Sequence, residues 1–242
     1  KKIFRKFDFC LTANLETQKY LRKLNAKNIR YIGNLKFVKN VNEKISIFKN
    51  FEKFTKDRII WCASNTHEGE ELISGLTHVY LKKKYKNLLT VIIPRHIERA
   101  PSIREKLKKI GLTVHIHDKK KKIPSKLDIY LVSSYGETAA FYNKTKNVFM
   151  GGSLIKHGGQ NPLEAIRFGC KVFHGPHVSN FREIYDYLIK EKISLKINSA
   201  KMLSVFLDKS FSRDYKINKI QKKIKIIGNN ILDQTYNEIK KT

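Results

Sequence analysis

The 242-residue sequence has few cysteines and no long apolar run, and each shortage excludes a class of protein. Its three cysteines, Cys10, Cys62 and Cys170, are an odd number at wide spacing without a CxxC pair. They exclude a disulfide-stapled secreted domain and predict three buried thiols in a reducing compartment. The longest clean apolar run, LLTVII at 88–93, is well short of the ~20 residues that cross a bilayer. The basic first ten residues lack the uninterrupted apolar stretch and small-residue cleavage site of a signal peptide.

Acidic side chains are also scarce. The sequence has 21 Asp and Glu against 50 Lys and Arg, a formal net charge of +29, which favours a polyanion or an anionic membrane surface as a neighbour. Only 10 of the 50 cations are arginine, although planar bidentate recognition of phosphate favours arginine. Much of the charge is therefore interpreted as a solvated lysine surface.

Short apolar runs alternate with helical patterns along the chain. This alternation is typical of strand, crossover helix and strand, and it predicts an α/β fold with a mostly parallel, Rossmann-like sheet. Apolar residues at helical spacing over 72–80 and 181–188 predict helices whose apolar faces pack on that sheet. Strands are predicted at 7–12, 29–32, 59–63, 88–93, 113–116, 129–132, 148–151 and 172–174.

A domain boundary is predicted between residues 38 and 58, where polar, charged and aromatic residues mix without a strand pattern. Residues 1–38 contain too few strands to close a core alone and are interpreted as the end of a domain whose other strands lie outside this sequence. Residues 39–215 form the larger predicted domain. An amphipathic helix is predicted over 216–242 from apolar residues at helical spacing, namely Ile217, Ile220, Ile224, Ile227, Ile231 and Leu232.

Polar and glycine-rich segments follow four of the predicted strands, where parallel sheets bind their ligands. They begin at Ser64, Pro94, Ser133 and Gly151. Seven of the 12 glycines lie within 136–175. Because glycine lets backbone N–H groups approach an anion, the segment GGSLIKHGGQ is predicted to form a phosphate- or carboxylate-binding loop. The same glycines also fit a simple turn, since GK[ST] and GxGxxG are both missing.

A helix is predicted to begin directly after this loop. Asn161 suits the N-cap, Pro162 the first helical position, and Glu164 the position where a capping box places its carboxylate. Unpaired N–H groups at a helix start attract an anion, although Glu164 could serve only as a cap. The histidine pairs 115/117 and 174/177 have no cysteine or carboxylate at metal-site spacing, so they are interpreted as structural, and no metal or cofactor is expected.

Seven segments, taken in order, resemble the 3-deoxy-D-manno-octulosonic acid (Kdo) transferase family. Each is modest alone, but their order and spacing together are specific. They are GNLKF at 33–37, THEGEE at 66–71, PRH at 94–96, GE at 136–137, GGSL at 151–154, GGQNPLEA at 158–165 and NFREI at 180–184.

The resemblance implies a two-domain GT-B glycosyltransferase, inverting and metal-independent, that transfers Kdo from CMP-Kdo to a lipid A precursor in lipopolysaccharide core biosynthesis. Its expected location is the cytoplasmic face of the inner membrane, next to an anionic membrane surface and without nucleic acid as a partner. This chain corresponds to the end of the N-terminal acceptor domain and the whole C-terminal CMP-Kdo-binding domain. The catalytic base is expected in the missing N-terminal part, so none is assigned here.

The resemblance also implies which residues bind CMP. Arg95 and the start of the helix at Asn161 would face the phosphate, Glu164 would accept hydrogen bonds from ribose hydroxyls, and the 135–137 turn would line the cytosine. Two residues near the predicted cleft, His67 and Ser153, are weaker candidates. The full predicted CMP set is Pro94, Arg95, Tyr135, Gly136, Glu137, Asn161, Pro162, Leu163 and Glu164.

Two positions depart from the usual family pattern. Gln160 stands where family members usually have histidine, and Asn65 where they tend to have serine. Because an amide does not titrate like an imidazole, a proton-carrying role at 160 is in doubt. Two alternative functions also remain open. One is a GT-B transferase that uses another sugar nucleotide. The other, suggested only by the charge, is a basic nucleic-acid-binding protein, although the sequence lacks an aromatic-rich RNA motif or a recognition helix.

Overall fold

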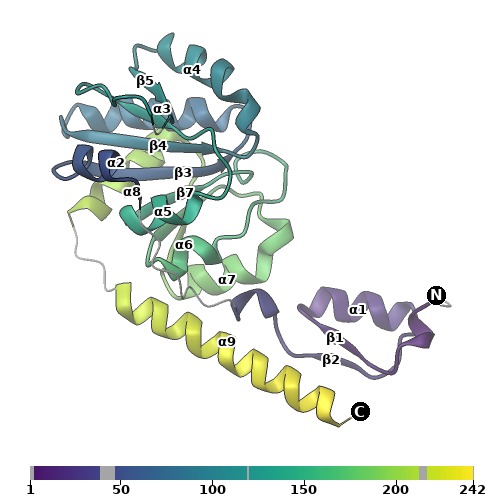
Figure 1. The fold of residues 1–242 in the computed structure, drawn as a ribbon. Coiled ribbons are helices and arrows are strands. Elements are labelled where there is room, and N and C mark those ends of the chain that lie inside the picture. Colours follow the sequence, from purple (N-terminus) through teal and green to yellow (C-terminus); the bar gives the residue numbers. More distant parts are fainter. Residues whose placement is uncertain (1–2, 39–46, 119, 213–216, 242) are drawn as a thin grey trace. The chain divides into compact units, whose positions relative to one another are not determined.

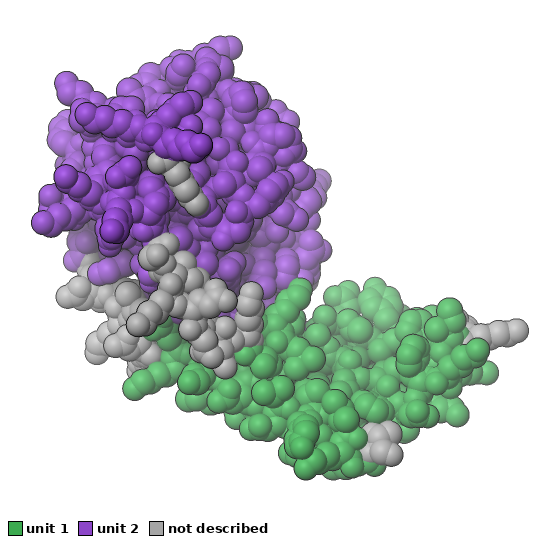
Figure 2. Space-filling view, in the orientation of Figure 1, with its two compact units in different colours: residues 1–42, 218–242 green, residues 43–217 purple. Residues whose placement is uncertain are grey.

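The computed structural model describes residues 3–38, 47–118, 120–212 and 217–241 (Figure 1). The chain forms two compact units, coloured separately in Figure 2: unit 1 is residues 1–42 and 218–242, and unit 2 is residues 43–217. The long C-terminal helix therefore belongs to the same unit as the N-terminus. The interpretation of residues 1–38 as the end of an acceptor domain stays a prediction, and residues 39–46 and 213–216, where both boundaries fall, lie outside the described residues.

Unit 2 is built on a seven-stranded, fully parallel sheet in the order β5-β6-β4-β3-β7-β8-β9 (Figure 1). The predicted α/β fold with a parallel sheet is thus confirmed. The strands are β3 Ile59–Thr66, β4 Leu88–Pro94, β5 Val114–Ile116, β6 Ile129–Leu131, β7 Asn147–Met150, β8 Lys171–His174 and β9 Ser194–Lys196.

Helices cover both faces of this sheet. One face forms the main core with α3, α4 and α8, where Trp61 and Phe149 from the strands are fully buried beside Leu107 of α4. The other face carries aromatic packing, in which Tyr130 lies between Phe51 of α2 and Phe141 of α5. The helices of unit 2 are α2 Lys49–Phe54, α3 Glu70–Lys82, α4 Ala100–Lys108, α5 Thr138–Lys144, α6 Leu163–Arg167, α7 Arg182–Lys190 and α8 Ala200–Phe211.

The apolar face predicted for the helix at 72–80 is buried only in part. Ile73 and Val79 are half-buried and Val79 packs against the core, but Leu72, Leu76 and Tyr80 are exposed. The fully buried face of α3 consists mainly of small and polar residues that include Ser74 and Gly75. Because a side chain at Gly75 would collide with Leu107, the helix uses small residues to approach its neighbours closely.

Two short elements of unit 2 were not predicted, and two other expectations need correction. The helix α2 lies inside the predicted boundary region, and the strand β9 lies at the sheet edge. The strand predicted at 7–12 is reduced to three residues and follows a 3-10 helix, Ile3–Lys6. Cys62 and Cys170 are buried free thiols as expected, but Cys10 is only half-buried because it lies in this short strand of unit 1.

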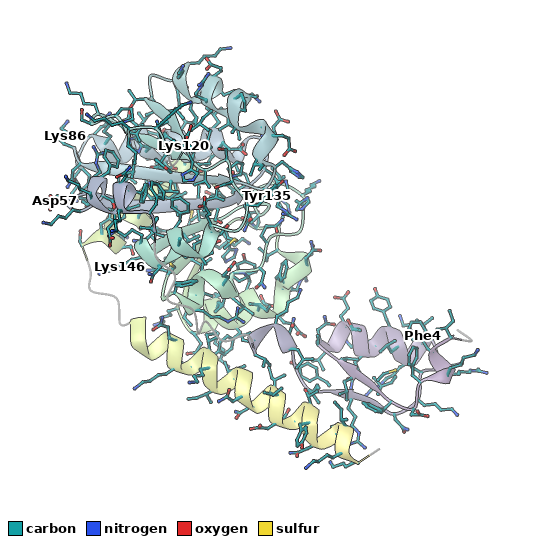
Figure 3. The ribbon with its side chains drawn as sticks, in the orientation of Figure 1. Phe4, Asp57, Lys86, Lys120, Tyr135 and Lys146 are labelled. Carbon is teal, nitrogen blue, oxygen red and sulfur yellow. The ribbon has the colours of Figure 1, made fainter. Side chains whose placement is uncertain are left out.

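The topology places the binding edge of unit 2. From the central strand β3, the chain crosses to β4 on one side, whereas β7, β8 and β9 continue on the other side. Ligands of such sheets bind outside the carboxyl ends of the strands at this reversal. The loops that follow β3, β4, β6 and β7 meet at this edge because all these strands are parallel. In Figure 3, Tyr135 lies at this end of the sheet, and Asp57 and Lys86 lie at the opposite end.

Unit 1 has only two parallel strands, β1 Cys10–Thr12 and β2 Ile29–Tyr31, joined by α1 Leu15–Lys23. The long helix α9, Ile217–Lys240, completes the unit and buries Ile224 and Ile231. An ion pair joins Arg30 of β2 to Glu238 of α9. The predicted C-terminal helix is therefore present, although the side chains of Ile217 and Ile220 lie outside the described residues and Leu232 is exposed.

Unit 1 also leaves several large apolar side chains exposed, among them Ile3, Leu15 and Leu35. Within the described residues, no helix of either unit is both long enough and apolar enough to span a bilayer.

Candidate functional site at the carboxyl ends of the strands

The turns after β3 and β4 are joined by their backbones. The amide of Arg95 donates a hydrogen bond to the carbonyl of Thr66 over 3.0 Å, and the amide of Gly151 donates to the carbonyl of Ser64 over 2.8 Å. The PRH and GGSL segments are therefore both fixed to β3, the strand at which the chain direction reverses. Three of the predicted motifs meet at one edge of the sheet.

The glycine-rich loop after β7 does bind an anion, and that anion is a side chain of the protein. Glu70, at the start of α3, is fully buried. Its Oε1 accepts hydrogen bonds from the amides of Ser153 (3.1 Å) and Leu154 (2.9 Å). Its Oε2 accepts from the amides of Gly152 (2.7 Å) and His67 (2.9 Å). The amides of GGSL are thus already occupied, which corrects the expectation that they are free to hold a substrate phosphate.

Close packing explains two glycines around this carboxylate. An added Cβ at Gly151 would clash with the backbone of Asn65, and one at Gly175 would clash with the backbone of Ser153. The hydroxyl of Ser153 donates to the carbonyl of Met150 over 2.6 Å and accepts from the amide of Gly175 over 2.7 Å. Ser153 is fully buried, so it supports the loop from inside and does not form a surface of the cleft.

A cluster of histidines surrounds the end of β3. The ring of His67, which is 8% exposed, lies 4.1 Å from the ring of His157 and 5.9 Å from that of His96, measured between centroids. The side-chain amide nitrogen of Gln160 lies 3.4 Å from Nε2 of His67. Burial, and then the nearby cationic and imidazole groups including Arg95, lower the pKa of His67 to about 4. His67 is therefore neutral at neutral pH, and its Nε2 can accept from the Gln160 amide.

The residues predicted to line the cytosine lie after β6. Tyr135 is 68% exposed and Gly136 has φ +81°, with open space where a Cβ would lie. Glu137 is held in place, because it accepts a hydrogen bond from Ser134 and lies 3.0 Å from Nε2 of His117. The other ring nitrogen of His117 lies 2.5 Å from the hydroxyl of Tyr130. These hydrogen-bonded side chains give Glu137 a fixed position beside an open turn.

The helix predicted to begin at Asn161 is a single short segment, α6. The side-chain oxygen of Asn161 accepts from the amide of Leu163 over 3.1 Å, but Pro162 occupies the N-cap position, one residue later than predicted. Glu164 is half-buried in the first turn, and no hydrogen bond or ion pair of its carboxylate is found within the described residues. This carboxylate is therefore available, and the capping-box interpretation of Glu164 receives no support from the geometry.

Of the predicted CMP residues, Arg95 lies near the weaker candidate His67, since it influences the pKa of that ring. Gln160, which was not among the predicted site residues, contacts the same ring. Two cavities of unit 2, of about 590 and 480 Å³, are lined by neither Arg95 nor Glu164. That Arg95 and Glu164 contact the same nucleotide stays a prediction.

Sequence reasoning placed Glu70 and His157 in the strand-end segments without giving either a role, and it interpreted His117 as structural. For Glu70 a signal existed, because an acid at a helix start that faces a glycine-rich loop can fill its amides. For the two histidines the contacts depend on strand order, which the sequence does not show. Among the described side chains, no group of three histidines, cysteines or acids is arranged to hold a metal ion.

No protein-family model matches the chain. Several curated proteins are similar to it in sequence. A 3-deoxy-D-manno-octulosonic acid transferase from Haemophilus influenzae is 36% identical over 179 residues, which are 72% of this chain and 41% of that protein. The transferase of the same name from Rickettsia bellii is 30% identical over 231 residues, 91% of this chain and 54% of that protein. The chain therefore spans about half the length of the curated relatives it matches.

Solved structures agree with these relatives. The C-terminal CMP-Kdo binding domain of WaaA from Acinetobacter baumannii has a TM-score of 0.61 and 25% identity, over 76% of this chain and 93% of that domain. A structure from Listeria monocytogenes, named a putative UDP-N-acetylglucosamine 2-epimerase, has a TM-score of 0.57 at 17% identity over 97% of this chain and 60% of its own. It supports the fold alone. The GT-B architecture expected from the sequence is confirmed. Over most of its length this chain is therefore similar to Kdo transferases, and it is similar in fold to the CMP-Kdo binding domain of one of them.

Proposed function

We propose that this chain is the donor-binding part of an enzyme that transfers Kdo from CMP-Kdo to a lipid A precursor during lipopolysaccharide core synthesis. The observation that carries the proposal is the match of this chain to a domain described as CMP-Kdo binding, over 76% of this chain and 93% of that domain. The strand-end residues supply chemistry that suits a cytidine monophosphate. The protein is proposed to work at the cytoplasmic face of the inner membrane, where its lysine-rich surface would face anionic lipid.

Arg95 is the proposed phosphate-binding residue. Its backbone is fixed to Thr66, its side chain is exposed, and no ion pair of its guanidinium occurs within the described residues. The reaction breaks the bond between the anomeric carbon of Kdo and a phosphate oxygen, so negative charge accumulates on CMP as it leaves. A cation fixed beside that oxygen stabilises the charge without needing to reorganise.

Glu164 is the proposed ribose-binding residue. A half-buried carboxylate without a hydrogen-bond partner can accept bonds from two adjacent hydroxyls. Tyr135, with its exposed ring, can stack on cytosine, and the glycine at 136 lets the backbone approach the base. The acceptor hydroxyl attacks the anomeric carbon with inversion and without a metal, and its proton passes to a base on the acceptor domain, to which we assign no residue of this chain.

Nucleotide binding tests this proposal directly. CMP should raise the unfolding midpoint of the chain, followed by the fluorescence of its single tryptophan, Trp61, which is buried in unit 2. Arg95→Ala or Glu164→Ala should weaken this protection by ~1–3 kcal/mol. Two residues of the same types on α4, the half-buried Arg104 and the exposed Glu105, give alanine controls that should leave CMP protection intact.

A panel of CMP, UMP and GMP then separates this function from the alternative of another sugar nucleotide. Equal protection by all three nucleotides, or no protection by CMP in a folded sample, would contradict the proposal.

A further inference from the structure

A second cavity opens beside the predicted CMP residues but shares none of them. It measures about 480 Å³ and lies at the carboxyl ends of β8 and β9. Its walls come from the loop after β7, from both strand ends and from α7. Its volume is within the ~300–1,000 Å³ range of small-molecule sites. The polar side chains of its lining that carry the argument are Lys156, His174, Arg182, Asp186 and Lys196.

The charges around this cavity favour an anion. Lys156, Arg182 and Lys196 are cations, whereas Asp186 is the one acid of the lining. Within the described residues, none of the three cations forms an ion pair with an acid of the protein. Cations gathered around a hollow without protein partners are free to bind a carboxylate or a phosphate. Arg182 and Asp186 are four residues apart on α7, so both lie on the same face of that helix.

The cavity also offers a hydrogen-bond acceptor, the carboxylate of Asp186, which is exposed in its lining. His174 forms the buried floor: its Nδ1 donates to the carbonyl of Gly175 over 2.7 Å, and its ring packs on Tyr185 with 4.4 Å between centroids. The Asp186 carboxylate needs a donor, and a bare anion has none, whereas a hydroxyl does.

We propose that this cavity is a binding subsite for an anionic sugar, with its carboxylate or phosphate toward Lys156, Arg182 and Lys196 and a hydroxyl toward Asp186. The subsite is separate from the residues proposed for CMP. Only the identification of its ligand as the Kdo group of the donor, or as a phosphorylated sugar of the acceptor, rests on the proposed function.

Ligand-observed NMR titrations of the chain at saturating CMP test the subsite, with four probes: free Kdo, glucose 6-phosphate, inorganic phosphate and glucose. At least one anionic sugar should bind saturably, and glucose should not. Preference for Kdo would assign the subsite to the donor sugar, and preference for glucose 6-phosphate would assign it to the acceptor. If neither anionic sugar binds while CMP still does, the subsite is refuted and the proposed function stands.

Variants distinguish specific binding in the cavity from nonspecific attraction to the positive surface. Arg182→Gln with Lys196→Gln should weaken anionic-sugar binding about tenfold or more and leave CMP affinity unchanged. A matched pair of exposed lysines outside the cavity, Lys190→Gln with Lys201→Gln, removes the same charge and should leave sugar binding unchanged. Equal losses in both pairs would refute the subsite. Trp61 fluorescence verifies that each variant is folded.

Asp186→Asn tests whether the Asp186 carboxylate accepts a hydrogen bond from a sugar hydroxyl. Removing this charge should tighten the binding of inorganic phosphate, because one repulsive group is lost. Anionic-sugar binding should not tighten in the same way, because its hydroxyls lose an acceptor. If both ligands gain equally, the cavity binds only simple anions and the sugar assignment is wrong.

Discussion

Glu70 should contribute more to the stability of unit 2 than any surface acid, and Glu70→Gln tests this. Each of its two carboxylate oxygens accepts two backbone N–H bonds. Glutamine keeps the size but offers one oxygen and one NH2 group, so in either orientation two buried N–H donors face another donor. Hydrogen bonds to a charged group contribute ~1.5–3 kcal/mol each, so the loss of two predicts ~3–6 kcal/mol.

Urea unfolding followed by Trp61 fluorescence measures this loss. Trp61 is the single tryptophan of the chain and is fully buried in β3, the strand that leads into the Glu70 turn. Its emission therefore reports unit 2. The matched control is Glu68→Gln, the same substitution two residues earlier, where the carboxylate is exposed and forms an ion pair with Lys106. The control should unfold close to the original protein, because exposed ion pairs contribute little.

The result that would refute the reasoning is a Glu70→Gln variant within ~1 kcal/mol of the unchanged protein, the scale of one ordinary hydrogen bond. That outcome would mean that water or a rearranged loop satisfies the four amides equally well. A variant that cannot fold gives a lower limit to the loss and agrees with the prediction, since whole domains are stable by only ~5–15 kcal/mol.

Two further predictions concern the same edge. The pKa of His67 is lowered from 6.5 to about 4 in the folded chain, so the unfolded chain binds a proton first as the pH falls. The free energy of unfolding should therefore be highest above pH 6.5 and decrease toward pH 4. His67→Gln should flatten this part of a stability-against-pH curve, and an unchanged slope would refute the prediction. Gly175→Ala should destabilise unit 2 by ~3 kcal/mol or more, because the added Cβ would clash with the backbone of Ser153. The control Gly111→Ala, where the space is open but φ is +82°, should lose only ~1–2 kcal/mol. Equal losses in urea unfolding would contradict the packing argument.

Much of the architecture followed from local pattern. Apolar runs at 88–93 and 129–132 marked β4 and β6 within a residue or two, because a strand buried on both faces must be apolar throughout. The helix over 72–80 was located but its buried face only in part, because close helix packing selected Ser74 and Gly75 over leucine. The three-residue strand β9 was missed, since so short an edge strand carries little pattern.

The sequence by itself predicted the parallel sheet and indicated that the glycine-rich segment would offer amides to an anion, and its ordered motifs resemble those of one family. Only the tertiary structure decided which anion those amides bind. Glu70 and Gly152 are 82 residues apart in sequence, and they meet because β3 and β7 are neighbours in the sheet. The same holds for His117 beside Glu137 and for the cations around the second cavity. Local sequence fixes the amide donors and the side-chain types, but strand order decides which of them face each other across the edge of the sheet.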